Sequence, residues 1–239
     1  MNALATPTEI GTGPLSRWSA AVYWAVMIEL LVVLTMLPGI VAVLLLDRSA
    51  SNTPLVALCF VPAGPALSAA VYAWRDYLSA TSAQRDLAPA RHFWRGYRLN
   101  WLDVLRWWVP TLAVLALLGV NVQHAGSTVG QPWAFASLVI ATGVLVWAIT
   151  ALVLTSLLAF RTRDVVRLAV YYVGAKPVMT LGNLAVVLVG TAIALLVSDR
   201  LLLLLASLVV AYLVRNGESM VEDATARFVA PSADATPTA

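Results

Sequence analysis

Long apolar segments separated by short polar stretches run through almost the whole chain. Six apolar segments can be delimited, at residues 20–46, 54–73, 107–120, 132–160, 178–197 and 201–214. About 20 apolar residues in a helix cross the roughly 30 Å hydrocarbon layer of a bilayer. The pattern therefore predicts an all-α fold, a polytopic membrane helix bundle with about six transmembrane segments. The last segment is short for a full crossing, so a hairpin that enters and leaves on one side is the alternative.

Two of the connections have a helical period of their own. From residue 90 onward, large apolar side chains recur at spacings of three and four, at Trp94, Tyr97, Trp101, Leu105 and Trp108. Arginines recur in the same way on an adjacent face, at Arg91, Arg95 and Arg98. Residues 161–174 combine arginines with an apolar side formed by Val165, Leu168, Ala169 and Tyr172. We therefore expect two cytoplasmic amphipathic connecting helices, with the pattern of helices that lie in the headgroup plane. Because the third apolar segment is short, direct continuation of the first of these helices into it is the alternative.

The basic residues follow the same alternation. Of the 15 lysines and arginines, one precedes the first segment, six lie in the second gap, four in the fourth gap and two after the last segment, which makes 13. The other two, Arg48 and Arg200, each adjoin an aspartate. Because cytoplasmic loops are enriched in Lys and Arg, both termini are predicted to be cytoplasmic. Tryptophans near the predicted span ends are expected to form an interfacial belt: Trp18, Trp74, Trp107, Trp108 and Trp133.

The composition leaves little room for a soluble domain. The chain is 61% hydrophobic and 11% charged, whereas soluble domains carry about 25% charged residues. We expect a disordered cytoplasmic arm at 1–17, an integral membrane domain at 18–216 and a mostly disordered cytoplasmic tail at 217–239. Topology and anionic lipid headgroups explain the net charge of +3, so the bilayer is the expected partner and nucleic acid is not.

Glu29 is the one carboxylate deep inside a predicted span. An ionised carboxylate at the bilayer centre costs roughly 2.5 kcal/mol or more, so this side chain should face the protein interior and find a partner. It is either part of a solute or proton site, or a carboxyl that is hydrogen-bonded to a neighbouring helix and holds the bundle together. Since no other predicted span offers an acidic residue, a proton relay is the weaker interpretation.

Two further features are candidate sites. Pro62, Gly64 and Pro65 must break or kink the second span, which either lines a cavity, as in transporters, or lets small residues pack closely. The arginine face, Arg91, Arg95 and Arg98, is a surface either for a cytoplasmic partner or for lipid headgroups. Neither feature identifies a particular ligand or reaction.

Enzyme motifs are absent from the sequence. It contains no Walker-type glycine loop, no His-Glu-x-x-His and no Gly-x-Ser-x-Gly. The single cysteine, Cys59, allows no intramolecular disulfide, and the histidines and aspartates form no metal-like cluster. We therefore expect no enzyme, no catalytic residue, no metal site and no cofactor.

Three stretches resemble the YesL-like bacterial integral membrane proteins, whose domain is of unknown function. They are Val61–Arg75, with its Pro-Ala-Gly-Pro-Ala start; Phe93–Asn100, with its Phe…Arg…Tyr-Arg…Asn pattern; and Leu168–Leu181. The resemblance covers about residues 18–216. The chain departs from the commoner family pattern at Pro62, which lies closer to Gly64 than in many members.

The resemblance implies a multi-pass protein of the bacterial plasma (inner) membrane, without any catalytic or binding residue to carry over. Family members often look like neighbours of carbohydrate-uptake transporters. The leading hypothesis is therefore an auxiliary component associated with carbohydrate uptake, with a carbohydrate ABC transporter as its partner at the arginine face. The alternative is a small-solute transporter or channel in its own right, built around Glu29 and the break at Pro62–Pro65.

Overall fold

The computed structural model describes residues 14–47, 49–80, 88–125 and 130–228. In these ranges the chain is helical and contains no β-strand. The chain forms ten α-helices in the described ranges, with a short 3₁₀ turn at Ala50–Asn52 between the first and the second. The helices are α1 (Pro14–Leu45), α2 (Thr53–Cys59), α3 (Ala63–Ser79), α4 (Pro89–Gln123), α5 (Gly130–Leu157), α6 (Thr162–Ala175), α7 (Pro177–Leu196), α8 (Asp199–Leu204), α9 (Ala206–Asn216) and α10 (Glu218–Phe228).

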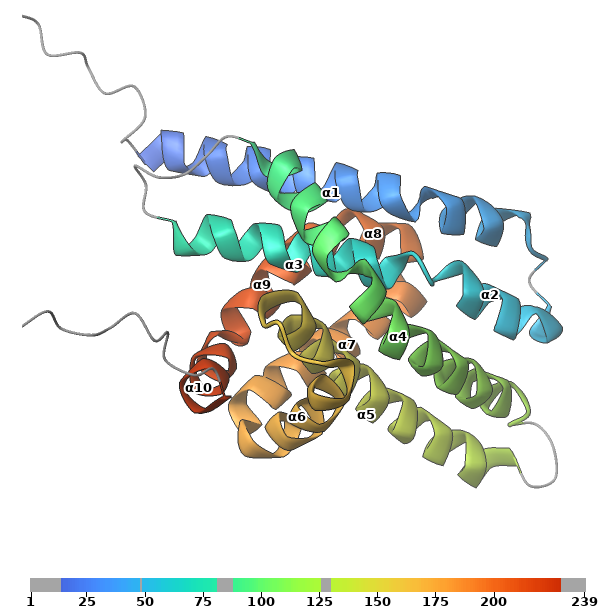
Figure 1. Ribbon diagram of the computed structural model, residues 1–239. Helices are drawn as coiled ribbons and strands as arrows, with labels where there is room; N and C mark the ends of the chain where they lie inside the picture. The colour runs from blue at the N-terminus through green and yellow to red at the C-terminus, as the bar shows by residue number, and fades with distance from the viewer. Residues whose placement is uncertain (1–13, 48, 81–87, 126–129, 229–239) are drawn as a thin grey trace, which may run out of the picture.

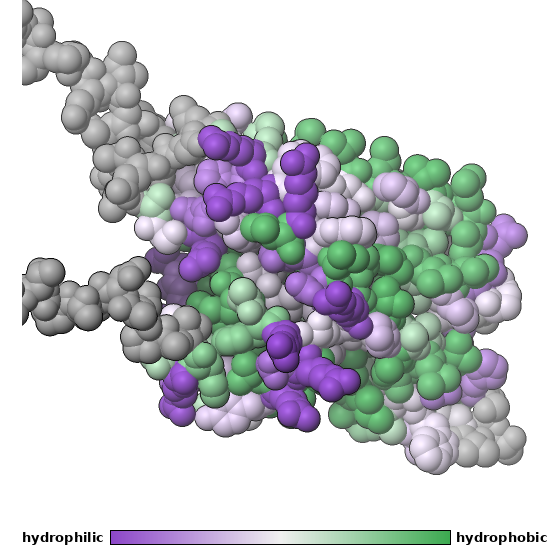
Figure 2. Space-filling model, viewed as in Figure 1, coloured by the Kyte–Doolittle hydropathy of each residue, from purple (hydrophilic) through white to green (hydrophobic). Residues whose placement is uncertain are grey.

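Five of these stretches are long and apolar enough to cross a membrane: α1, α2 with α3, α4, α5 and α7. The predicted all-α membrane bundle is therefore confirmed. The start of α1 and the end of α10 lie at the same end of the bundle, at the left of Figure 1. Hydrophilic surface gathers toward this end in Figure 2, and apolar surface covers the opposite half. We call the end formed by the C-terminus of α3, the N-terminal half of α4, α6 and α10 the basic end.

The predicted boundaries of the arm and of the sixth segment differ from the structure. Residues 1–13 of the predicted arm lie outside the described residues, and its last four residues already belong to α1. The segment predicted at 201–214 is broken at Leu205 into α8, of 6 residues, and α9, of 11 residues. At about 1.5 Å per residue neither piece can cross the hydrocarbon layer alone.

The first predicted connecting helix is not a separate element. Residues 89–123 form one continuous 35-residue helix, α4, which contains both the amphipathic stretch and the third span. At about 1.5 Å per residue it is roughly 50 Å long, so part of it must extend beyond the hydrocarbon layer or run obliquely. The second connecting helix is separate, as predicted: α6 has 14 residues and buries Val165, Ala169 and Tyr172.

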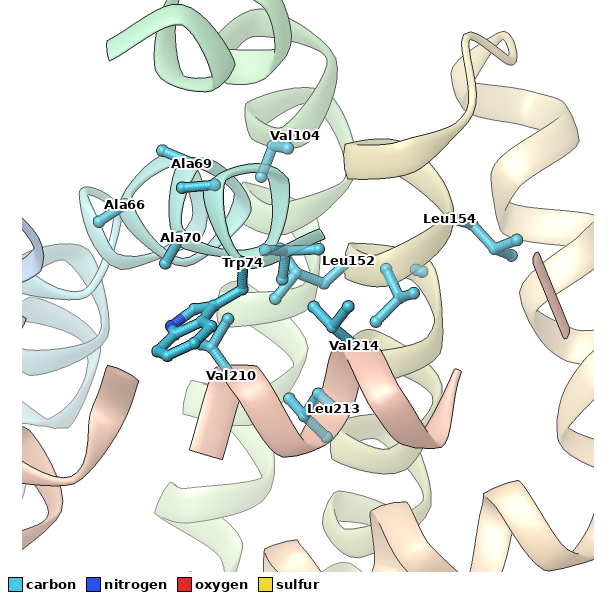
Figure 3. Packing of buried hydrophobic residues seen from close by; sticks show 14 of the residues in the cluster. Ala66, Ala69, Ala70, Trp74, Val104, Leu152, Leu154, Val210, Leu213 and Val214 are labelled. Carbon is cyan, nitrogen blue, oxygen red and sulfur yellow. The ribbon is translucent and has the colours of Figure 1, made fainter. Parts of the chain in front are cut away.

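Small residues place α3 at the centre of the bundle. Ala66, Ala69, Ala70 and Ala73 are fully buried on this helix. Alanine faces allow close approach of membrane helices, which gain stability from packing when lipid supplies no hydrophobic driving force between them. Figure 3 shows the result: the alanines of α3 lie beside α4, and Trp74 extends toward α9.

The predicted tail is largely a packed helix. Helix α10 spans 11 residues, and its Met220 and Ala224, four positions apart, are buried. Its polar side is held as well: the Tyr172 hydroxyl donates to Asp223 Oδ2 at 3.1 Å, and Arg227 Nε donates to Asp223 Oδ1 at 2.9 Å. The tail was predicted to be mostly disordered apart from a short helical turn. The structure extends that turn to the 11-residue helix α10, and 229–239 lie outside the described residues.

The contact of α10 with α6 should depend on pH. Burial and then the Asp223 hydrogen bond raise the pKa of Tyr172 to about 12. Burial acts to raise the pKa of Asp223, but hydrogen bonds from Tyr172 and Arg227 outweigh it and lower the pKa below its ordinary 3.8. The stabilisation by Asp223 is therefore present above its ordinary pKa and lost as the pH falls through the lowered value. The stabilisation by Tyr172 is present below the ordinary pKa of this residue and is lost as the pH rises toward about 12.

We therefore expect α10 to stay docked at neutral pH and to detach in strong acid or strong base. Ala226 is exposed on α10, so the Cys59→Ser, Ala226→Cys protein can carry one fluorophore on this helix. Its anisotropy should be high at pH 7 and lower below pH 3.8, the ordinary value for Asp223. The Asp223→Asn version of this protein should show reduced anisotropy already at pH 7. Equal anisotropy in the two proteins at pH 7 would contradict the role of the carboxylate.

Candidate functional site

Glu29 joins α1 to the break between α8 and α9. Its Oε2 accepts a hydrogen bond from the backbone N–H of Ser207 at 2.7 Å. Ser207 is the second residue of α9 and is buried, so its N–H has no partner within the helix. The Ser207 Oγ in turn accepts a hydrogen bond from Trp74 Nε1 at 3.1 Å. The carboxylate thus acts as an N-terminal cap supplied by another helix.

The surroundings of Glu29 are apolar. The carboxylate borders a groove of about 600 Å³ between α1 and α8–α9. Apart from Glu29 and Ser207, the groove is lined by alanine, valine and leucine side chains: Val22, Ala25, Val26, Leu30, Val33, Leu204 and Leu208. The second oxygen, Oε1, is buried and has no hydrogen-bond partner among the described residues. The geometry provides one hydrogen-bond acceptor and no polar route for a solute along this groove.

The predicted helix break is filled by a tryptophan. Helix α2 ends at Cys59 and α3 begins at Ala63, so the break is centred just before Gly64. Trp108 Nε1 donates to the Phe60 carbonyl at 3.0 Å, and this carbonyl also accepts the backbone N–H of Ala63 at 3.1 Å across the break. Gly64 makes room for this side chain, because a Cβ there would lie 2.7 Å from the indole ring of Trp108.

The two prolines sit where a helix tolerates them. Pro62 precedes α3 and Pro65 lies in its first turn, where the missing N–H has no intrahelical partner to lose. Gly64 and Pro65 are both buried. The break is therefore a junction between α2 and α3 that packs against α4.

The arginine face lies on the outside of α4 at the basic end. Arg91, Arg95 and Arg98 are exposed, while Phe93 and Gly96 of the same turns are buried against α3. Gly96 permits this contact, because a Cβ there would lie 2.7 Å from Tyr72 Cβ. Figure 2 shows hydrophilic surface over this part of the molecule.

Two tryptophans extend this exposed surface. Trp94 and Trp101, predicted as an apolar stripe, are 39% and 43% exposed. A substantial part of each indole is therefore accessible on the outside of α4. We call the exposed set Arg91, Trp94, Arg95, Arg98 and Trp101 the arginine–tryptophan face.

A hydrogen bond between helices that the sequence pattern did not predict lies behind this face. His92 Nδ1 and Asp76 Oδ2 are 2.8 Å apart, which joins α4 to α3. The imidazole also lies against Trp24 of α1, with ring centroids 5.7 Å apart. The partners are separated by the connection that includes residues 81–87, and no periodicity links positions across it. The N-terminal half of α4 is thus tied to two other helices.

A family model matches the N-terminal part of the chain. The model, described as "Protein of unknown function, DUF624", covers residues 20–122. This range holds Glu29, the helix break and the arginine–tryptophan face, and it ends within α4. No curated protein and no solved structure gives a significant match. Together with the apolar helices, the match indicates an integral membrane protein of unknown function.

Proposed function

We propose that this protein is a non-enzymatic auxiliary component of the bacterial plasma membrane, with both termini in the cytoplasm. It binds a partner protein at its arginine–tryptophan face. One observation carries the proposal: arginines and tryptophans stand exposed on a helix whose opposite side is fixed against α3 by Phe93 and Gly96. Arginine and tryptophan are among the residues most enriched at the energetic centres of protein interfaces, and a rigid helix presents them at little entropic cost.

The internal contacts favour binding over transport. A transporter built around Glu29 and the proline break would need both to face a polar cavity. Instead Glu29 accepts the Ser207 N–H and borders an apolar groove. The break at Phe60 is occupied by the Trp108 indole. Both features support a structural role, and the solute transporter or channel becomes the weaker alternative.

A carbohydrate ABC importer is the partner we propose. The support is the resemblance of the chain to YesL-like proteins, whose members look like neighbours of such importers. The charge of the face adds a requirement: the docking surface on the importer should be acidic, since complementary charges steer association and set the register of an interface.

Neutralising the face should weaken the association. In Arg91→Gln, Arg95→Gln, Arg98→Gln protein, we expect roughly thirtyfold weaker binding to the importer, the effect of losing about 2 kcal/mol at an interface centre. The measurement is the amount of importer that copurifies from membranes with a tagged protein. The matched control, Arg75→Gln, Arg167→Gln, Arg215→Gln, removes three exposed arginines elsewhere and should leave the amount unchanged.

Two results would overturn the proposal. One is that no importer copurifies with the unaltered protein while carbohydrate uptake stays normal after deletion of the gene. The other is equal recovery of importer with the triple variant and with the unaltered protein. In the first case, binding of the face to vesicles that contain anionic lipid would identify the headgroup layer as its partner.

A further inference from the structure

A second basic feature lies at the junction of α4 with the α5–α6 connection. A cavity of about 740 Å³ opens there. Its polar lining includes Asn100, Asp103, Arg106, Arg161, Thr162 and Arg163. None of these residues belongs to the arginine–tryptophan face, so the cavity is a separate site.

The charge of this cavity is unbalanced. Three arginines and one aspartate line it, which gives a formal charge of +2. Arg106 Nη1 binds Asp103 Oδ1 at 2.6 Å and is thereby neutralised. Within the described ranges no carboxylate forms an ion pair with Arg161 or Arg163. Two guanidinium groups at one cavity therefore remain available for an anion.

The backbone adds positive potential at the same place. Arg161 is extended, at φ −66° and ψ 146°, and α6 begins directly after it at Thr162 without a side-chain cap. The start of a helix carries roughly half a positive charge, and its free N–H groups are hydrogen-bond donors for an anion. The Thr162 hydroxyl is a further donor on the lining. Guanidinium, amide and hydroxyl donors together match the acceptor oxygens of a phosphate.

The other side of the cavity is apolar and the floor is fixed. Leu99, which is 58% exposed, and Phe160 belong to the lining. Below them Asn100 Nδ2 donates to the Ser156 carbonyl at 3.3 Å, and the hydroxyls of Ser156 and Ser68 are 2.8 Å apart. These bonds join α3, α4 and α5, so the α4 side of the cavity is held against the end of α5 before a ligand arrives.

We infer that this cavity binds a phosphate ester, with Arg161 and Arg163 holding the phosphate oxygens. An apolar wall beside a phosphate site, close to the end of a membrane-spanning helix, suits the headgroup and first acyl carbons of an anionic phospholipid. A soluble phosphorylated molecule presents the same phosphate chemistry. The inference is independent of the proposed function, because it concerns other residues and needs no partner protein.

Native mass spectrometry of the purified full-length protein can test the site. The probes are phosphatidylglycerol, phosphatidylcholine and glycerol 3-phosphate. We expect phosphatidylglycerol to bind in preference to phosphatidylcholine. Its affinity should fall roughly thirtyfold in Arg161→Gln, Arg163→Gln protein, because each basic residue contributes about 1 kcal/mol at an anionic lipid surface.

Two control proteins separate the site from general electrostatics and from misfolding. Arg75→Gln with Arg215→Gln removes the same charge at exposed positions outside both sites and should keep the phosphatidylglycerol affinity. Arg161→Lys with Arg163→Lys keeps the charge and should retain most of the affinity, which shows that the pair can be replaced without loss of fold.

The outcomes are distinct. Binding of phosphatidylglycerol that the Gln pair weakens supports the site and identifies a lipid as its ligand. Binding of glycerol 3-phosphate, weakened by the same pair, supports the site with a soluble ligand. If neither phosphatidylglycerol nor glycerol 3-phosphate binds, or if the Gln pair and the Arg75/Arg215 control behave alike, the inference is overturned. A loss of importer binding in the arginine–tryptophan variants leaves this result unaffected, so the two proposals fail separately.

Discussion

Gly39→Ala is expected to destabilise the protein by about 1–3 kcal/mol, the usual cost of overpacking a close contact. Gly39 follows Pro38 in α1 and is buried where α1 meets the end of α2. A Cβ at this position would overlap the carbonyl oxygen of Cys59, with the carbonyl carbon 3.2 Å away. Because the obstacle is backbone and not the end of a flexible side chain, α1 and α2 would have to separate.

Thermal unfolding in detergent, followed by tryptophan fluorescence, measures this effect. A loss of this size should lower the Tm by roughly 5–10 °C in a chain of this length. Cys59, the single cysteine of the chain, gives a local readout: maleimide labelling should be faster in the variant, since the displaced contact adjoins this residue.

Gly143→Ala is the matched control for Gly39→Ala. Gly143 also lies inside a long helix, α5, but an added Cβ there meets no atom within 4 Å. Alanine should therefore leave the Tm unchanged or raise it slightly, because its helix propensity exceeds that of glycine by up to about 1 kcal/mol. Equal Tm values for the two variants would show that the α1–α2 contact contributes little.

Segment length and helical period predicted much of the fold. The all-α bundle and the separate helix α6 follow from apolar runs and from spacings of three and four, which depend only on local sequence. The same period placed Arg91, Arg95 and Arg98 on one exposed side of α4. It did not establish that the amphipathic stretch and the third span form one helix, because Pro110, a residue typical of a helix start, lies inside α4.

The tryptophans show where prediction from the local sequence pattern fails. Trp18 and Trp133 are 73% and 66% exposed, as expected for a belt at the membrane surface. Trp74 and Trp107 were assigned to the same belt, but they are buried and donate hydrogen bonds to Ser207 and Thr155. The belt assignment was wrong for these two because distance from a span end does not reveal which side of a helix faces another helix.

The sites show the same division between local and tertiary information. An isolated carboxylate in a span indicates that it needs a donor. It does not indicate that the donor is a backbone N–H 178 residues away. That donor exists because the sixth segment breaks at Leu205, a break without proline or glycine in the local sequence. The cavity at Arg161 and Arg163 was missed for a similar reason, since these arginines were counted only as topology signals.

Glu29→Leu is expected to destabilise the protein by about 1–3 kcal/mol, because the buried N–H of Ser207 would lose its acceptor. Lipid cannot replace that acceptor, so the start of α9 would have to shift or fray. Thermal unfolding in detergent should show the loss as a lower Tm. Trp74, hydrogen-bonded to the Ser207 side chain, should report the shift through a change in its fluorescence.

The Glu29→Gln variant distinguishes the two proposed roles of this carboxylate, a helix cap and a proton or solute site. The amide oxygen of glutamine still accepts the Ser207 N–H, so a cap predicts a Tm close to that of the unaltered protein and unchanged carbohydrate uptake. A proton or solute site predicts a different combination: an unchanged Tm with loss of activity, because glutamine can neither ionise nor release a proton. Uptake that fails in a stable Glu29→Gln protein would therefore revive transport as the function, while joint preservation of stability and uptake would leave Glu29 as a bond between helices.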